Sequence, residues 1–180
     1  MAVIALAGRR TDAPDATNVR FPPANVDIVK ERIRRHLERL TARTLVCSAA
    51  CGADLVALDA AGELGLRRRV VLPFAEGRFR ETSVIDRGTE WGSLFDRILT
   101  ELRVQNDVVT LESVADDATA YVAANTRILD EAQSAAAATA EDVVAVLVWE
   151  GESRGEDDLT EAFGREARLR GLPVVHVLTS

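Results

Sequence analysis

The chain has 180 residues, 22 of them basic and 29 acidic, and a formal net charge of −7. This length suits one domain, expected to span residues 1–180, which can bury a core without disulfide or metal staples. No apolar run reaches the roughly 18 residues of a membrane-spanning helix, and the N-terminus lacks the pattern of a signal peptide. We therefore expect a cytoplasmic protein without a membrane partner. The acidic balance and scattered basic residues also argue against long nucleic acid as a partner.

Short β-branched segments alternate with longer amphipathic segments along the chain. In chain order, the pattern predicts a strand at 3–7, a helix at 26–40, a strand at 44–48, a helix at 53–66, a strand at 69–73, a helix at 91–104, a strand at 108–111, a helix at 119–138, a strand at 143–149, a helix at 159–170 and a strand at 173–178. Regular alternation with continuous apolar strands is typical of a mostly parallel sheet with helices on both faces. The predicted fold class is an α/β three-layer sandwich of Rossmann-like type.

Residues 48–54, Ser-Ala-Ala-Cys-Gly-Ala-Asp, form a turn of small residues between a predicted buried strand and a predicted helix. Such a turn leaves backbone N–H groups free beside the positive end of the helix dipole, which suits phosphate or carboxylate. We therefore predict ligand contacts from Ser48, Cys51 and Gly52, with Gly52 allowing close approach. Asp54 either contacts the ligand or caps the helix.

Other loops at the same predicted sheet edge add polar and aromatic groups. Gly8, Arg9 and Arg10 follow the first strand, with pairing of these arginines to surface aspartates as the alternative to a ligand role. Residues 75–90, rich in Arg and Glu, are long enough to form a mobile flap. The pattern suits a small anionic molecule that carries a base, such as a nucleotide. Its base is expected near Phe74 or Trp149, although Trp149 at the end of a buried strand is also typical of a core residue.

The two cysteines do not suggest a metal or redox centre. Cys47 and Cys51 lack the C-x-x-C spacing, and His36 and His176 are the only histidines that could complete a zinc site. We expect Cys47 in the core, Cys51 at the turn, and neither a metal nor a cofactor.

Several segments together resemble one branch of the SLOG superfamily, the Rossmann-like group that includes DprA-type and LOG-type proteins. The segment 8–10 is similar to its Gly-His-Arg, and 48–54 followed by Val-Leu-Pro-Phe at 71–74 is similar to its Ser-Gly-x-Ala-x-Gly-Ala-Asp and Leu-Pro-Phe. Tyr121, Asn125 and Ile128 match its helix motif, and residues 142–151, ending in Gly151, match its Asp-x-x-Ile-Ala-x-Trp-x-Gly strand. The matches occur in the family's order along nearly the whole chain.

The resemblance implies recognition of a nucleotide or a nucleotide-derived signal, with ligand roles for Asn125, Gly151 and Thr160, and self-association into a homo-oligomer. Three positions depart from the pattern. Arg9 replaces a His, Ala49 replaces a Gly, and Asp-Leu-Thr at 158–160 replaces Gly-Gly-Thr before the last helix. The acidic residues of this last segment would repel phosphate and resemble a solvated rim. Asn125 and Thr160 could instead bond only to nearby backbone.

An enzymatic function is the second hypothesis, because related folds cleave N-glycosidic bonds with a helix glutamate. Counting back from the end of the last helix places Phe163 at that position, and Glu161 is turned by about 200° from it. Glu150, Asp158 and Glu161 remain the candidate carboxylates, but no catalytic residue is assigned. We therefore favour a non-catalytic binding protein. A partner-binding module without a ligand is the third hypothesis.

Overall fold

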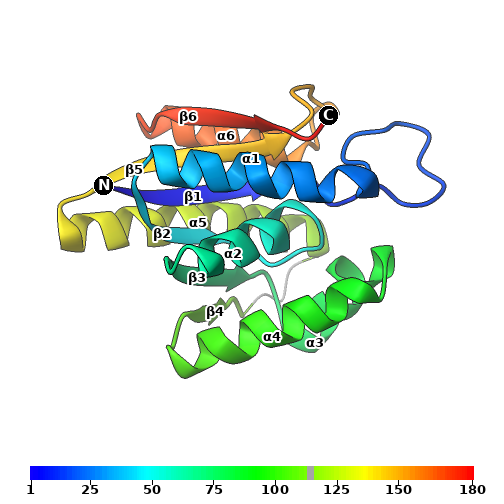
Figure 1. The fold of residues 1–180 in the computed structure, drawn as a ribbon, viewed down its shortest axis with the longest axis horizontal. Helices are drawn as coiled ribbons and strands as arrows, with labels where there is room; N and C mark the ends of the chain where they lie inside the picture. The colour runs from blue at the N-terminus through cyan, green and yellow to red at the C-terminus, as the bar shows by residue number, and fades with distance from the viewer. Residues whose placement is uncertain (113–115) are drawn as a thin grey trace.

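The computed structural model describes residues 1–112 and 116–180 and contains a six-stranded sheet. The strand order is β4-β3-β2-β1-β5-β6, and every neighbouring pair is parallel (Figure 1). The strands are β1 (Ala2–Gly8), β2 (Ala42–Cys47), β3 (Arg67–Leu72), β4 (Val108–Thr110), β5 (Asp142–Trp149) and β6 (Val174–Leu178). The helices are α1 (Val26–Arg39), α2 (Ala53–Glu63), α3 (Glu76–Ser83), α4 (Glu90–Val104), α5 (Asp117–Thr139) and α6 (Leu159–Leu169), with 3-10 turns at Pro23–Asn25 and Ile85–Arg87.

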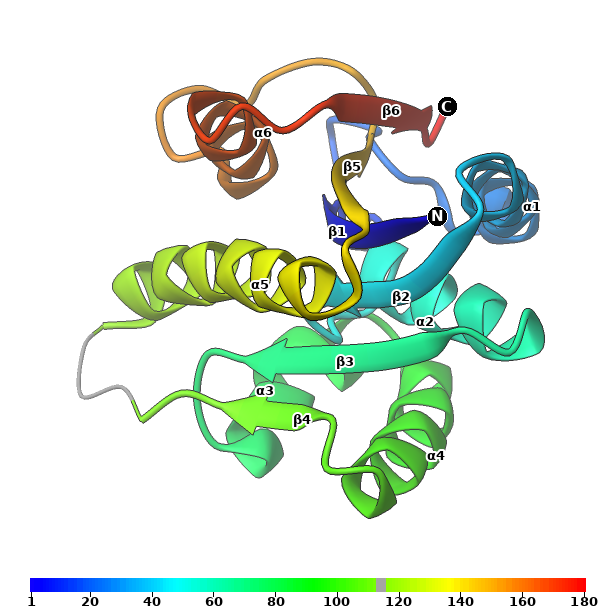
Figure 2. The ribbon, with the colours of Figure 1, turned by 90° about the vertical axis from the view of Figure 1, so that its left-hand side faces the viewer.

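Helices cover both faces of the sheet, as the alternating pattern predicts. Figure 2 shows α5 and α6 on one face and α1, α2 and α4 on the other. Successive residues of β1 point to opposite faces, so Ile4 and Leu6 pack with α1, α2 and α4, while Val3 and Ala5 pack with α5 and α6. The predicted Rossmann-like α/β sandwich is therefore confirmed.

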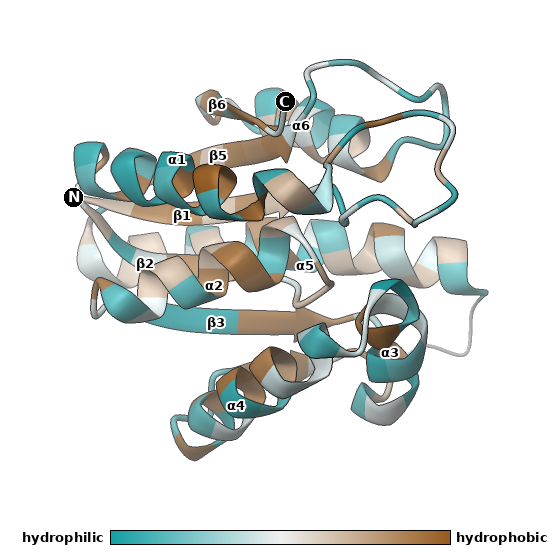
Figure 3. Ribbon diagram, turned by 45° about the vertical axis from the view of Figure 1, so that its right-hand side comes forward, coloured by the Kyte–Doolittle hydropathy of each residue, from teal (hydrophilic) through white to brown (hydrophobic). Residues whose placement is uncertain are grey.

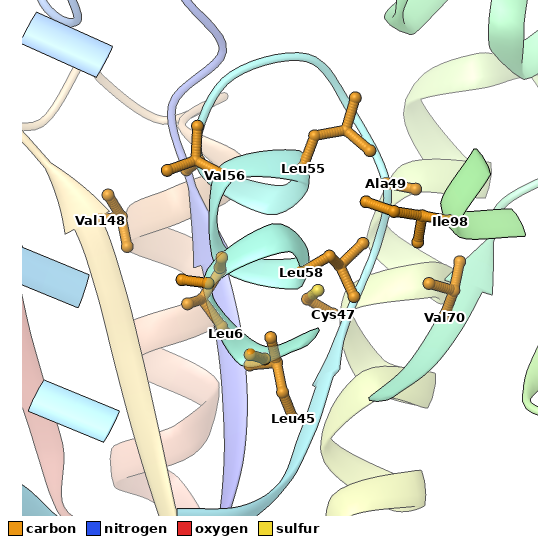
Figure 4. Packing of buried hydrophobic residues seen from close by; sticks show 14 of the residues in the cluster. Leu6, Leu45, Cys47, Ala49, Leu55, Val56, Leu58, Val70, Ile98 and Val148 are labelled. Atoms are coloured by element: carbon orange, nitrogen blue, oxygen red, sulfur yellow. The ribbon is translucent and has the colours of Figure 1, made fainter. Parts of the chain in front are cut away.

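Helix α2 is the most deeply buried helix of the face that it covers. It is apolar nearly all round, and Leu55, Val56 and Leu58 pack against β1, β2 and α4, as Figure 4 shows. By contrast, α1 is amphipathic, and only its stripe of Val29, Ile33 and Leu37 is buried. Packing on three sides fixes the position of the first turn of α2 at the carboxyl ends of the strands.

The chain reverses direction across the sheet at β1. It adds β2, β3 and β4 on one side of β1 and then returns through α5 to add β5 and β6 on the other side. The loops that leave β1 and β5 diverge at this point, which is where ligands bind in open parallel sheets. Figure 3 shows hydrophilic residues along the loops at this edge and hydrophobic residues along the strands.

The segment 75–90, which is long enough to form a mobile flap, contains a packed helix. Residues 76–83 form α3, and its Phe79 is fully buried between Phe74 and Phe95, with ring centroids 6.0 and 6.2 Å away. The apolar residues of this segment are too widely spaced to show a helical period, and a single aromatic ring anchors the helix. Within the described residues, no helix is long and apolar enough to cross a membrane.

Candidate functional site

A cavity of about 450 Å³ opens where the carboxyl ends of the strands meet α2, α3, α5 and α6; we call it the edge pocket. Leu6 and Ile128 are almost fully buried and form part of its floor. Arg10, Arg87 and Arg154 also line it, with side chains that are 28%, 29% and 46% exposed, and so mark its rim. The predicted site residues that line the pocket are Gly8, Arg9, Arg10, Ser48, Asp54, Asn125 and Thr160.

Three amides of the turn before α2 donate hydrogen bonds within the chain. The N–H of Ala50 donates to the Asp54 carboxylate at 3.2 Å, that of Cys51 to the carbonyl of Ser83 at 2.9 Å, and that of Ala53 to the carbonyl of Arg9 at 3.0 Å. These three donors are therefore used within the chain. Neighbouring loops thus take donors that the sequence analysis assigns to phosphate, and phosphate binding at this helix terminus stays a prediction.

Gly52 makes a close approach to the chain itself rather than to the pocket. Its φ is +97°, and a Cβ there would lie 2.6 Å from the Thr11 nitrogen and 2.7 Å from the Arg9 oxygen. Neither Gly52 nor the buried Cys51 lines the pocket. The glycine therefore serves to dock the β1 loop on α2, which corrects its predicted ligand role.

We expect Gly52→Ala to lower the free energy of unfolding by about 1–3 kcal/mol, because the backbone atoms around the new methyl group cannot move aside cheaply. Urea denaturation measures this change. Gly155→Ala is the matched control, since Gly155 also has a positive φ, +110°, but open space around its Cβ position. Equal losses in the two variants would attribute the effect to backbone conformation alone.

Arg9 is a structural ion-pair residue, which corrects its predicted phosphate contact. Its guanidinium is 3% exposed and donates to both carboxylate oxygens of Asp158 at 2.6 and 2.7 Å, to Glu150 at 2.7 and 3.1 Å, and to the carbonyl of Glu152 at 2.9 Å. Burial opposes the charge of Arg9, but hydrogen bonds to Asp158 and Glu150 outweigh it and raise the Arg9 pKa. The hydrogen bonds of the Arg9 guanidinium therefore go to the loop between β5 and α6.

The acidic loop before α6 is folded inward at Asp158 instead of forming a solvated rim. Asp158 is 1% exposed and accepts the N–H groups of Thr160 and Glu161, so it caps α6 while it pairs with Arg9. Burial alone would raise the Asp158 pKa, but the bonds from Arg9 and the backbone N–H groups hold it well below its usual range. The terminus of α6 is therefore already occupied by a carboxylate, while Glu156 and Asp157 remain exposed.

The rim arginines keep part of their hydrogen-bonding capacity. In the described part of the chain, only Nη1 of Arg10 is engaged by hydrogen bonds, to Asp86 at 2.9 Å and to a carbonyl of α3 at 3.2 Å. Arg87 donates Nη1 to the carbonyl of Thr11 at 3.0 Å. The backbone N–H of Arg154 donates to Asp158 at 2.8 Å, but the Arg154 guanidinium lies 3.9 Å from that carboxylate and forms no shorter ion pair among the described residues. Arg10 is paired with Asp86, and not with the surface aspartates expected as its alternative.

Asp54 is the unusual carboxylate of the pocket. It is 8% exposed, lines the pocket, and accepts only the N–H of Ala50 among the described hydrogen bonds. Burial raises the pKa of Asp54 to about 7, and the single backbone bond offsets this only slightly. Asp54 therefore bonds to the turn and lines the pocket, and it does not cap α2, whose N-terminus has no side-chain cap. Its acidic group titrates near neutral pH.

Two polar residues of the pocket are fixed by neighbouring groups. The amide of Asn125 donates to the carbonyl of Leu159 at 3.0 Å, which is the backbone role weighed for it, and the residue still lines the cavity. Thr160 is 4% exposed and is held by the Asp158 cap. The Tyr121 hydroxyl is hydrogen-bonded to that of Ser83, so α5 and α3 are joined at the pocket wall.

Phe74, Trp149 and Gly151 do not line the edge pocket, so it gives no support to the predicted position of a base near these rings. Trp149 is 7% exposed and packs in the core beside His176, with the Arg9 guanidinium 5.5 Å from its ring centroid. Phe74 is 4% exposed and meets Tyr121 edge to face. Gly151 is exposed and turns the loop after β5 with a φ of +93°.

Both cysteines are buried free thiols, and burial raises the pKa of Cys51 to about 11, so neither is poised to react. No cluster of metal-binding side chains occurs in residues 1–112 and 116–180.

Sequence reasoning missed Arg20, Arg87 and Arg154 as lining residues. Arg20 and Arg154 lie in loops and Arg87 ends a short 3-10 turn, so no periodicity points to a shared surface. The abundance of arginine in segment 75–90 is the one signal that could have indicated Arg87.

No protein-family model matches the chain, and no curated protein matches it. Among solved structures, the chain is similar to an X-ray structure of DNA processing protein A (DprA) from Streptococcus pneumoniae, with a TM-score of 0.42 and 14% sequence identity. The match covers 97% of this chain and 58% of that one, so the chain spans little more than half the length of its neighbour.

One prediction about partners is corrected: the acidic charge balance does not suffice to exclude long nucleic acid. Net charge describes the whole chain, whereas binding depends on local groups such as the rim arginines.

Proposed function

We propose that the edge pocket binds a small nucleotide or nucleotide-derived anion and that the chain acts as a binding protein. The observation that carries this proposal is the combination of a cavity of about 450 Å³ with three arginines, Arg10, Arg87 and Arg154, at its rim. Such a volume suits a ligand of nucleotide size, and guanidinium groups suit phosphate.

The position of the rim arginines suggests that the nucleotide binds in the opposite orientation to the one that the sequence suggests. Because amides of the turn before α2 donate within the chain and Arg9 is buried in its ion pairs, the phosphate would lie at the rim. The uncharged end of the ligand would then reach the inner wall formed by Ser48, Asp54 and Asn125.

We also infer that residues 1–180 form one domain of the SLOG type. Segments that carry the resemblance in sequence come from distant parts of the chain, yet Gly8, Ser48, Asn125 and Thr160 line one cavity. Two of the positions that depart from the SLOG pattern contact each other, because Arg9 and Asp158 form an ion pair. The two departures therefore belong to one site.

The enzymatic alternative receives no support from the carboxylates considered for it. Glu150 and Asp158 are bound to Arg9, and Glu161 is hydrogen-bonded to the Ser153 hydroxyl outside the pocket. Phe163, at the position of the expected helix glutamate, is 1% exposed in the core. We therefore keep the binding function as the proposal.

A thermal-shift screen tests the proposal with AMP, GMP, cyclic AMP, ADP-ribose and a short single-stranded oligonucleotide. A ligand present at about 100 times its Kd stabilises the fold by about 2.7 kcal/mol, which raises the Tm measurably. The oligonucleotide is included because nucleic acid is not excluded. If no compound at millimolar concentration raises the Tm, the proposal fails.

For a nucleotide that binds, we expect Arg10→Ala to weaken the affinity by about ten- to a hundredfold, because one charge-assisted hydrogen bond to phosphate contributes roughly 1.5–3 kcal/mol. Isothermal titration calorimetry measures the change. Arg80→Ala is the matched control, since Arg80 is also paired with an aspartate, Asp96, but lies outside the pocket. Equal affinities of the two variants would show that the phosphate does not lie at Arg10.

A further inference from the structure

The edge pocket holds a carboxylate that the proposed phosphate contacts do not use. Asp54 is more than nine-tenths buried, lines the cavity, and lies on the first turn of α2. Its Oδ2 accepts the N–H of Ala50 at 3.2 Å, and Oδ1 receives no hydrogen bond from the residues described. A carboxylate oxygen facing a cavity without a donor is a vacant acceptor in a place that is costly for a charge.

The groups around Asp54 do not neutralise it. The residue forms no ion pair within the described residues, although the pocket contains several arginines. Cys47 of β2 is the neighbouring titratable group beneath it, and proximity to Asp54 contributes to the raised pKa of that thiol. The other titratable groups that line the pocket are Arg9, Arg10 and Asp12 of the loop after β1, Arg20, Arg87 after α3, Tyr121 of α5, and Arg154 before α6.

We propose that Asp54 is the specificity-determining residue of the edge pocket and accepts a hydrogen bond from an O–H or N–H donor on the uncharged end of the ligand. This inference rests on the proposed function, and it names the ligand class more narrowly. The ligand carries an anionic group for the rim arginines and, at its other end, a donor such as a sugar hydroxyl or a base amine. A ligand without that donor leaves the buried acceptor unsatisfied.

The distribution of charge across the pocket supports this orientation. Arg10, Arg87 and Arg154 occupy the rim, while Asp54 lies inside the pocket without an ion-pair partner among the described residues, so an anionic group placed beside Asp54 would be repelled. The small side chain of Ser48, which also lines the pocket, leaves room for a sugar or base beside the carboxylate. The pocket therefore discriminates between the two ends of one molecule.

A donor from the ligand stabilises the ionised form of Asp54 and lowers its pKa on binding. Because the Asp54 pKa is about 7 in the free protein, the affinity is expected to rise between pH 6 and pH 8 as the carboxylate forms. The phosphate of a nucleotide also titrates in this range. The Asp54→Asn variant shows the pH dependence that the phosphate causes by itself, because it keeps every arginine but has no carboxyl group at position 54.

The experiment measures binding by calorimetry at pH 6 and pH 8 with AMP, 2′,3′-dideoxy-AMP and purine riboside 5′-monophosphate. The second probe lacks the sugar hydroxyls and the third lacks the base amine, so the pair distinguishes the two sources of the donor. Asp54→Asn is the test variant, because an amide oxygen can still accept the Ala50 N–H and preserve the turn. Asp59→Asn is the control on the same helix, outside the pocket, where Asp59 pairs with Lys30 and Arg97.

We expect one of the two altered probes to bind the wild-type protein at least tenfold more weakly than AMP at pH 8. Asp54→Asn should weaken AMP binding by a similar factor, abolish the discrimination, and flatten the extra pH dependence, while Asp59→Asn changes none of these. If all three probes bind equally and Asp54→Asn has no effect, the inference is overturned and the proposed function stands. If no probe binds either protein, the inference is overturned, and the proposed function is decided by the other compounds of the thermal-shift screen.

Discussion

Arg9→Met is expected to lower the free energy of unfolding by about 3–5 kcal/mol, enough to unfold a domain of ordinary stability in part. The substitution leaves Asp158, which is 1% exposed, and the largely buried Glu150 without the cation that both share. Removing one partner of a buried ion pair leaves an uncompensated charge, and this costs far more than the pair contributes when intact. Urea denaturation at neutral pH, followed by circular dichroism, measures the loss.

Two further variants distinguish the ion pair from a simple loss of side-chain bulk. Arg10→Met removes the adjacent arginine, whose partner Asp86 is partly exposed, and should cost less than about 1 kcal/mol. Arg9→Lys keeps the charge but cannot bond to two carboxylates with a planar fork, so its cost should be intermediate. A stability of Arg9→Met close to that of Arg10→Met would contradict the structural role of this network.

The sheet and its helices follow from the sequence because hydrophobic periodicity records burial directly. The apolar run at 143–149 predicts a strand covered on both faces, and β5 (Asp142–Trp149) lies inside the sheet. Predicted boundaries differ from those observed by a few residues, chiefly where a helix ends without a clear stop signal. The helix predicted at 53–66, for example, ends at Glu63.

The location of the candidate site follows from the sequence as well, but the assignment of its groups does not. Small residues at 48–54 correctly indicate a tight turn at the carboxyl edge. The same residues cannot tell whether the freed amides meet a ligand or a neighbouring loop. That depends on α3, whose Ser83 carbonyl takes the Cys51 N–H, and on the loop after β1.

Long-range charge pairing lies beyond local patterns altogether. Arg9 and Asp158 are 149 positions apart, and nothing near either residue indicates the other. The acidic segment before α6 therefore predicts repulsion of phosphate when taken alone. Only the folded chain shows that Asp158, the buried residue of this segment, pairs with Arg9. Both residues then have a structural role that their local sequences do not indicate.

Asp54→Asn is expected to stabilise the protein by about 2–4 kcal/mol at pH 8, although it removes a group that lines the pocket. Burial raises the Asp54 pKa from 3.8 to about 7, so the folded state retains a proton that the unfolded state loses. Such a group contributes fully to stability below the unfolded pKa, and that contribution is lost as the pH rises toward the folded pKa. Above pH 7 the folded wild type therefore contains a buried ionised carboxylate, which lowers its free energy of unfolding. The Asp54→Asn variant contains no such charge.

The gain should shrink on acidification, since protonation makes the wild-type carboxyl neutral as well. Between pH 8 and pH 5 the stability difference between Asp54→Asn and the wild type should fall by roughly 2 kcal/mol, measured as paired urea unfolding curves at each pH. Asp59→Asn shows the opposite sign, because ion pairs with Lys30 and Arg97 lower the Asp59 pKa against the effect of its partial burial. A stability difference for Asp54→Asn that does not vary with pH would mean that Asp54 is ionised throughout and that its charge is satisfied in the free protein. A pH-dependent gain in stability would show that the Asp54 carboxylate destabilises the free protein, as expected of a group that serves a ligand rather than the fold.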